Sequence, residues 1–275
     1  MNKEKILITG AAGTIGEQLL KYYIEHNYFI IAVDYNESQL IKLDTIYRQN
    51  NFITLPFSYH DDELIKQVEI IQPDTVIHAA TLKNTKYSEI YSDYYWKYNV
   101  IHSLDFIKRL IDNNVKRIIF LSSNEAYKPH NQFGEQKLAV ESYLKQLNTR
   151  SIIQSVRFPF ILESSGSVYH IFSNQAINNL PLTVTSRDAT KLTSNIENFM
   201  REWTIFFENI IDNGVYDFDI GEMLSIYSLA EAMINETQSS SHIEVVGLRQ
   251  GDIISEEKLN DSERRHIISQ IYEVI

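Results

Sequence analysis

Short apolar runs alternate with segments of helical spacing through the first 157 residues of the chain. The apolar runs are Lys5–Thr9, Phe29–Val33, Asn51–Leu55, Thr75–His78, Arg117–Leu121 and Ile152–Arg157. After the first run, apolar side chains recur at the period of an amphipathic helix, at Ile15, Leu19, Leu20, Tyr23 and Ile24. Strand–helix alternation of this length predicts a parallel sheet with helices on both faces. We therefore expect an α/β fold built on a doubly wound parallel sheet.

The alternation loosens after residue 158. The pattern there predicts helices at 168–178, 196–212 and 225–235 and short strands at 182–185, 215–219 and 243–247. No shift in composition marks a free linker, so we expect a domain at 1–157 and a smaller lobe at 158–275 packed on it.

The segment 87–112 (KYSEIYSDYYWKYNVIHSLDFIKRLI) is crowded with aromatic residues. Its length and spacing predict one long helix that packs on the core. An excess of tyrosine and tryptophan also suits a helical interface between two copies of the chain, which is a second hypothesis.

Charge and cysteine content exclude several functions. The formal net charge of the 275-residue chain is −11, which argues against binding to nucleic acid. The chain has no cysteine, so it forms neither disulfides nor thiolate metal sites, and we expect no metal. No signal-peptide core follows MNKEK, and no apolar run approaches the ~20 residues of a bilayer span. We therefore expect a cytoplasmic protein with no membrane partner.

A glycine-rich turn joins the first strand to the first helix in ILITGAAGTIGEQLL. Gly10 permits the tight turn, Gly13 lets backbone N–H groups approach a pyrophosphate, and Gly16 allows close packing of helix and strand. The first helical turn, at Thr14 and Ile15, supplies N–H groups and a dipole that favours negative charge. This G-x-x-G-x-x-G loop, between a strand and a helix, predicts a dinucleotide site.

Asp34 ends the second strand, about 20 residues after the loop. A carboxylate at this place binds the two hydroxyls of a ribose, which favours NAD over NADP. We expect the cofactor to be NAD(H) or NADP(H), since the preference rests on Asp34 alone.

At this point the sequence resembles the extended short-chain dehydrogenase/reductases, a Rossmann-like family acting on nucleotide sugars. It looks most like the UDP-N-acetylglucosamine 4,6-dehydratase (CapD-like polysaccharide biosynthesis) branch. The similar stretches are TGAAGTIG, HAATLKN (78–84), YNVIHS (98–103), RFPFILESSGSVYHIF (157–172), LTVTSRDATK (182–191) and GLRQGDIISEEKL (247–259). They extend over nearly the whole chain.

The resemblance implies roles for individual residues. Ala79 and Ala80 are expected near the adenosine, and Lys137 is expected to hold the nicotinamide ribose and support proton transfer. Arg157 and Arg249 are expected to face the diphosphate of a UDP-sugar, although a structural ion pair is an equal alternative for Arg157. Lys83 and Asn124 are further substrate-binding candidates in the implied site. By the same resemblance, residues 158–275 form the substrate lobe.

Two departures from the family pattern alter the expected chemistry. Related enzymes place Thr-Asp-Lys or Thr-Asp-Glu after the fifth strand, where this chain has Ser123, Asn124 and Glu125. An amide such as Asn124 cannot donate a titrating proton to a leaving hydroxyl, a step that is typically worth ~10²–10⁴ in rate. Phe133 stands where the superfamily keeps a proton-transferring tyrosine, four residues before Lys137.

The expected catalytic residues are therefore Ser123, Glu125 and Lys137. Tyr127 and His130 are weaker candidates, because loop residues of these types are more often surface residues. Ser58 replaces the adenine-side aspartate of the family, which weakens the choice between NAD and NADP.

This pattern favours a 4-ketoreductase, which needs one hydride and one proton, over a 4,6-dehydratase. The predicted substrate is a UDP-4-keto-6-deoxy-N-acetylhexosamine, the product of a dehydratase in polysaccharide biosynthesis. Its proton is expected from Lys137 or through a water bound to Ser123. Two alternatives are open: a dehydratase that uses Glu125 with altered acid chemistry, and a catalytically silent subunit that binds nucleotide sugar or cofactor. We expect a homo-oligomer in each case.

Overall fold

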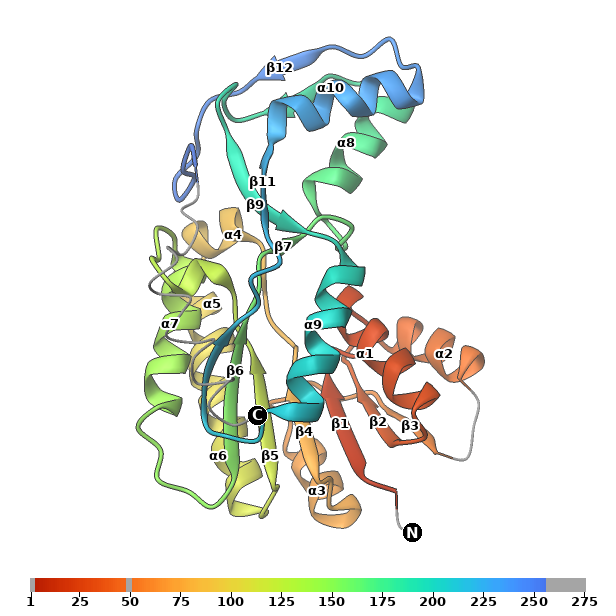
Figure 1. The fold of residues 1–275 in the computed structure, drawn as a ribbon, viewed down its shortest axis with the longest axis vertical. Coiled ribbons are helices and arrows are strands. Elements are labelled where there is room, and N and C mark those ends of the chain that lie inside the picture. Colours follow the sequence, from red (N-terminus) through yellow and green to blue (C-terminus); the bar gives the residue numbers. More distant parts are fainter. Residues whose placement is uncertain (1–2, 48–50, 256–275) are drawn as a thin grey trace. The chain divides into compact units, whose positions relative to one another are not determined.

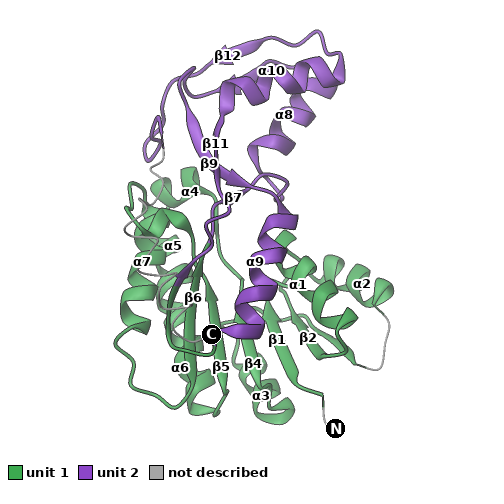
Figure 2. Cartoon of the chain, viewed as in Figure 1, with its two compact units in different colours: residues 1–157, 211–215 green, residues 158–210, 216–275 purple. Residues whose placement is uncertain are grey.

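The computed structural model of the chain describes residues 3–47 and 51–255. The described residues separate into two compact units, one within residues 1–157 and 211–215 and the other within residues 158–210 and 216–275 (Figure 2). Residues 256–259, the end of the GLRQGDIISEEKL stretch, and the rest of the predicted lobe up to 275 lie outside the described residues.

A seven-stranded sheet organises the first unit, in the order β10-β6-β5-β4-β1-β2-β3 (Figure 1). The strands are β1 (Lys5–Thr9), β2 (Phe29–Val33), β3 (Phe52–Leu55), β4 (Thr75–His78), β5 (Arg117–Leu121), β6 (Ile152–Arg157) and β10 (Gly214–Asp217). All the pairings from β3 across to β6 are parallel. The predicted doubly wound parallel sheet is confirmed.

Helices join these strands. They are α1 (Thr14–Glu25), α2 (Glu37–Ile46), α3 (Asp62–Ile71), α4 (Thr85–Ile90), α5 (Ser92–Trp96), a π-helix (Lys97–His102), α6 (Ser103–Asp112), the 3-10 turn η2 (Asn124–Ala126) and α7 (Gln132–Leu144). The alternate strand residues Leu7, Ile31, Val76 and Ile118 pack in one core with apolar side chains of α3, α6 and α7. Their neighbours, such as Ile6, Ile8, Ile30 and Ile77, are equally buried. Both faces of the sheet are therefore covered, as near-continuous apolar strands require.

The predicted long helix at 87–112 is wrong as a single element. The structure ends α4 at Ile90, begins α5 at Ser92, and passes through the π-helix before α6. Tyr87, Tyr91 and Tyr94 are exposed rather than part of the core.

The second unit contains short strands and three helices among its described residues. These elements are β7 (Phe160–Ile161), α8 (Val168–Ile177), β8 (Leu182–Val184), β9 (Thr190–Ser194), α9 (Ile196–Asn209), β11 (Glu222–Ser225), α10 (Ile226–Thr237) and β12 (Ile243–Val245). Strands β11, β9 and β7 form one small sheet, and β12 pairs with β8. None of the helices in the described ranges is long and apolar enough to span a bilayer.

Candidate functional site

Six parallel strands of the first unit end at one edge of its sheet, because their registers run side by side from β3 to β6. The glycine loop follows β1, Asp34 follows β2, Ala79 and Ala80 follow β4, and residues 123–125 follow β5. Ligands of open parallel sheets bind at this carboxyl edge. The fold thus gathers most of the predicted site residues in one region.

The glycines of the loop are required by close backbone contacts. Gly10 has φ +67, and a Cβ on it would lie 2.8 Å from the backbone nitrogen of Ala80. A Cβ on Gly16 would lie 2.2 Å from the carbonyl oxygen of Gly10. Gly10 therefore brings the loops after β1 and β4 together, and Gly16 lets α1 start against the turn.

The N-terminus of α1 fits an anionic group. Gly13 precedes the helix with no side chain capping it, whereas Asn36 caps α2 and Asn131 caps α7. The first-turn N–H groups, at Thr14 and Ile15, lie at the positive end of the helix dipole. Such a terminus behind a glycine turn fits the pyrophosphate of a dinucleotide.

Asp34 is fixed beside this loop. Its Oδ2 accepts a hydrogen bond from the backbone N–H of Ala12 at 3.1 Å, and its Oδ1 accepts one from Asn36 at 2.9 Å. Each carboxylate oxygen has a second lone pair, so the half-buried Asp34 retains acceptor sites for a diol. This arrangement fits an adenosine ribose.

A buried histidine at the end of β4, His78, supports the same loops through hydrogen bonds. His78 Nδ1 lies 2.8 Å from Thr9 Oγ1, and His78 Nε2 lies 3.0 Å from Ser103 Oγ. Burial lowers the pKa of His78 to about 3, so the ring is neutral. The hydroxyl of Thr9 also accepts from the N–H of Ala80 at 3.3 Å. Sequence reasoning missed this network, whose signal is a histidine that ends an otherwise apolar strand.

Lys137 is buried on α7, with 4% of its surface exposed. Its Nζ donates to the carbonyl oxygen of Leu121 at 2.8 Å and lies 4.5 Å and 5.6 Å from the ring centres of Phe120 and Phe133. Burial lowers the pKa of Lys137 to about 7, against a smaller opposite effect of the Glu141 charge. Lys137 is thus able to hold and release a proton near neutral pH.

The turn after β5 is held against the start of α7. Ser123 Oγ accepts from the N–H of Glu125 at 3.2 Å, and Glu125 Oε2 accepts from Asn131 Nδ2 at 2.6 Å. Asn131 in turn caps α7, because its Oδ1 accepts a hydrogen bond from the N–H of Gly134. A Cβ on Gly134 would lie 2.6 Å from the carbonyl oxygen of Glu125, so only glycine allows this approach. The structure brings Ser123, Glu125 and Lys137 to one end of α7.

Asn131 and Gly134 are supporting residues that sequence reasoning missed. The available signal was Asn131 itself, a residue type that commonly caps the start of a helix. Asn124 and the weaker candidate His130 lie in the same half-buried turn, where His130 Nε2 is 3.2 Å from Asn131 Nδ2.

The other predicted substrate residues lie in different surroundings. Arg157 makes a bidentate ion pair with the buried Glu141, with Nη2 2.5 Å from Oε2. This is the structural ion pair that was the alternative to a substrate contact. Lys83 follows β4, and desolvation lowers its pKa although its side chain reaches solvent. Arg249, in the second unit, is exposed and donates to Asp252 at 3.0 Å. Their contacts with a substrate remain predictions.

The pKa of Lys137 predicts how Lys137→Met changes stability with pH. The unfolded chain binds a proton at the ordinary lysine pKa of 10.5, whereas the folded chain binds it only below about 7. The cost of burying Lys137 is therefore full below pH 7 and declines as the pH rises toward 10.5. We expect Lys137→Met to be the more stable protein at pH 6.5, with an advantage that shrinks by about 3 kcal/mol by pH 9.5.

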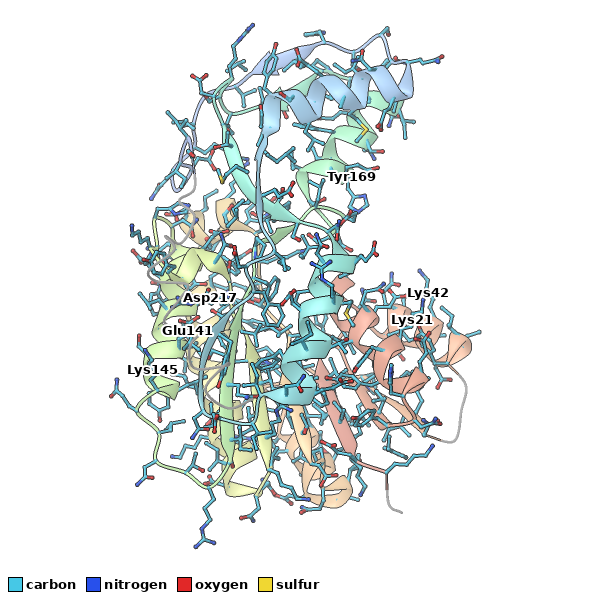
Figure 3. The ribbon with its side chains drawn as sticks, in the orientation of Figure 1. Lys21, Lys42, Glu141, Lys145, Tyr169 and Asp217 are labelled. Atoms are coloured by element: carbon cyan, nitrogen blue, oxygen red, sulfur yellow. The ribbon has the colours of Figure 1, made fainter. Side chains whose placement is uncertain are left out.

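Urea unfolding of both proteins at pH 6.5, 8.0 and 9.5 measures this difference. Lys145→Met is the matched control, because Lys145 is exposed at the end of the same helix (Figure 3). Curves for Lys137→Met and wild type that stay parallel over this range contradict the assigned proton affinity.

Comparison with known proteins identifies the family. The sequence profile described as "Polysaccharide biosynthesis protein" matches residues 6–274. The chain belongs to this family. Within the polysaccharide biosynthesis family, the chain is 25% identical over its full length to the capsular polysaccharide biosynthesis protein CapD of Staphylococcus aureus. It spans 48% of CapD, about half of that protein's length.

A second relative is an enzyme of similar length. The chain is 27% identical to a UDP-N-acetylglucosamine 4,6-dehydratase (inverting) of Campylobacter jejuni, over 93% of the chain and 77% of that enzyme. The resemblance stated from the sequence is therefore confirmed at the level of the family.

Solved structures agree on the fold. Pen from Bacillus thuringiensis superposes with a TM-score of 0.85 at 25% identity, over 92% of this chain and 80% of Pen. The UDP-glucose 4-epimerase of Thermus thermophilus, solved with NAD, superposes with a TM-score of 0.81 at 15% identity, over 95% of this chain and 92% of the epimerase. The latter likeness establishes the Rossmann-like fold alone.

Proposed function

We propose that this member of the polysaccharide biosynthesis family is an NAD(P)H-dependent 4-ketoreductase of a UDP-4-keto-6-deoxy-N-acetylhexosamine. The observation that carries the proposal is the buried Lys137, whose pKa is lowered to about 7, beside a phenylalanine in place of a tyrosine. A reductase requires one proton donor at the carbonyl oxygen, and Lys137 has the proton affinity for that task near neutral pH.

The cofactor assignment is supported by the fit of the carboxyl edge. Gly10, Gly13 and Gly16 would hold the pyrophosphate at the start of α1, and Asp34 would hold the adenosine ribose, which favours NAD. A bound reduced nicotinamide would supply the hydride for the carbonyl carbon of the sugar. The epimerase of Thermus thermophilus was solved with NAD on the same fold.

Within this chain the proton step is simple. The ammonium of Lys137 gives one proton to the carbonyl oxygen, which becomes a hydroxyl, and the neutral amine regains a proton from solvent. Phe133 packs beside the amine, and burial lowers the pKa of Lys137 to about 7, so the acid is strong enough to act at neutral pH. The hydroxyl of Ser123, now 3.4 Å from Asn124 Oδ1, would orient the sugar oxygen by donating to it instead.

The residues of the site provide less of the acid and base chemistry that elimination across carbons 5 and 6 of the sugar requires. Asn124 offers no titrating proton, and the carboxylate of Glu125 accepts a 2.6 Å hydrogen bond from Asn131. The dehydratase alternative is nevertheless supported by the Campylobacter jejuni relative and by the carboxylate of Glu125 itself. It is therefore a second candidate, with the silent binding subunit as the third.

Two incubations followed by NMR of the sugar distinguish the candidates. One contains UDP-N-acetylglucosamine with NAD, and the other contains the 4-keto-6-deoxy product with NADH or NADPH. Oxidation of the reduced nucleotide with formation of a 6-deoxy sugar in the second tube is expected. A 4-keto product in the first tube overturns the reductase in favour of the dehydratase. Cofactor binding without turnover in either tube leaves the silent subunit.

A further inference from the structure

A buried charge cluster lies behind Lys137. Glu141 lies one helical turn further along α7 (Figure 3). Its side chain is buried, with 2% of its surface exposed. Its carboxylate accepts from Arg157 Nε at 2.9 and 3.1 Å and from Arg157 Nη2 at 2.5 Å. The hydroxyl of Ser122 also donates to Oε1 of Glu141. The helix, β5 and β6 are thus joined by one carboxylate.

The described contacts place two cations, Lys137 and Arg157, around the carboxylate of Glu141. Residues four apart on a helix are neighbours on one face, and these two side chains bind adjacent residues at the end of β5: Lys137 donates to the carbonyl oxygen of Leu121, and Glu141 accepts from Ser122. At this short range the charge of Glu141 raises the pKa of Lys137. Arg157 binds the same carboxylate and offsets part of its field. The protonated lysine therefore shares its counter-charge with an arginine that cannot titrate.

The other groups around Lys137 add no second anion among the described contacts. From β5 come the carbonyl of Leu121 and the ring of Phe120, and from α7 comes the ring of Phe133. From β4 comes His78, which is neutral and whose pKa the lysine charge helps to lower. Glu141 is thus the carboxylate that acts on the charge of Lys137.

We propose that Glu141 is a positioning residue that holds the proton on Lys137, and that Arg157 limits how strongly it does so. Glu141 touches neither substrate nor cofactor in this role and acts through Lys137. The contribution of Glu141 to catalysis rests on the proposed function, in which Lys137 is the acid. The effect of Glu141 on the protonation of Lys137 does not depend on that function. Ser122, directly after β5, fixes the carboxylate of Glu141 on α7 together with Arg157 of β6.

Removal of the Glu141 charge and removal of the Arg157 charge are expected to shift the titration midpoint of Lys137 in opposite directions. Glu141→Gln keeps an acceptor for Ser122 and Arg157 but removes the negative charge, so the midpoint falls by about one pH unit. Arg157→Met removes the positive charge that binds this carboxylate, so the midpoint is expected to rise by about one pH unit. Glu141→Asp keeps the charge and is expected to stay closest to wild type.

The measurement is an NMR titration of protein labelled at the lysine side-chain ε-carbon, with Lys137→Met identifying the resonance. It uses the free protein, without sugar or cofactor, and thermal unfolding verifies that each variant is folded. The matched control is Glu135→Gln, because Glu135 is exposed on the same helix and is expected to leave the midpoint unchanged. The pH profile of the reductase reaction is then recorded for the same proteins.

Opposite shifts for Glu141→Gln and Arg157→Met support the inference. If one of them does not fold, the sign of the shift in the other decides. An unmoved midpoint, or a shift as large in Glu135→Gln, overturns it even when turnover persists. Shifted midpoints in a protein that never reduces the 4-keto sugar overturn the proposed function and leave the inference about Lys137 intact.

Discussion

Lys137→Met is expected to reduce the turnover of a 4-keto nucleotide sugar by about 10²–10⁴-fold, the typical contribution of a positioned general acid. The variant removes the 2.8 Å hydrogen bond to Leu121 and the ammonium that lies 5.6 Å from the centre of the Phe133 ring. The wild-type rate is expected to fall as the pH rises through about 7, because the ammonium then loses its proton. Single-turnover oxidation of NADH, measured from pH 5.5 to 9, gives both quantities.

Lys145→Met is the control for this experiment, since it removes an exposed lysine from the end of the same helix. Phe133→Ala is expected to lower the rate only as far as lost packing explains. Full activity in folded Lys137→Met contradicts the assignment of the site, whatever the other variants do.

The central sheet was predictable because its strands are buried on both faces. Continuous apolar runs such as IIF at 118–120, with polar turns on either side, leave little ambiguity about where a parallel strand lies. β7, β9 and β11 were not predicted. Their sequences, FI, TKLTS and EMLS, are short or mostly polar, and their pairing depends on partners distant in the chain.

The break in the aromatic segment shows tertiary contacts overriding local spacing. Ser92 and the indole of Trp96 both donate to the side-chain oxygen of Gln132, at the start of α7. The N–H of Gln132 in turn donates to Glu89 at 2.7 Å. These bonds connect residues about 40 positions apart, so no window of 11–18 residues contains the information.

The site was predictable where a residue acts through the backbone and less so where it acts through another side chain. The roles of Gly10 and Gly16 follow from one loop, and the structure places close backbone contacts at both. The roles of Asn131 and Glu141 require the approach of α7 to β5 and β6, which a single sequence does not encode locally. Arg157 illustrates the limit: the sequence left a structural ion pair and a substrate contact as equal alternatives, and it did not indicate Glu141 as the partner that the structure shows.

Gly16→Ala and Gly13→Ala are expected to separate packing from ligand contact within the same loop. A Cβ on Gly16 would lie 2.2 Å from the oxygen of Gly10 and 2.8 Å from the Cα of Ala11, both backbone atoms that cannot turn aside. The helix propensity of alanine recovers about 1 kcal/mol. We still expect a net loss of about 2–4 kcal/mol in the free energy of unfolding, because α1 must move away from the turn.

Gly13→Ala meets a milder constraint. Gly13 has φ −80 and ψ 165, which alanine adopts without strain, and its Cβ would lie 3.2 Å from the oxygen of Gly10. The free energy of unfolding is therefore expected to fall by less than about 1 kcal/mol. The added methyl group is expected to keep the pyrophosphate from the backbone of the first helical turn, which weakens NADH binding by about tenfold or more.

Urea unfolding and calorimetric titration with NADH measure the two effects on the same samples. Unchanged NADH affinity in a fully folded Gly13→Ala would place the pyrophosphate elsewhere. Wild-type stability in Gly16→Ala would show that α1 starts farther from the turn than the 2.2 Å contact requires. Because the two glycines are three residues apart in one loop, any general weakening of the turn would affect both variants alike.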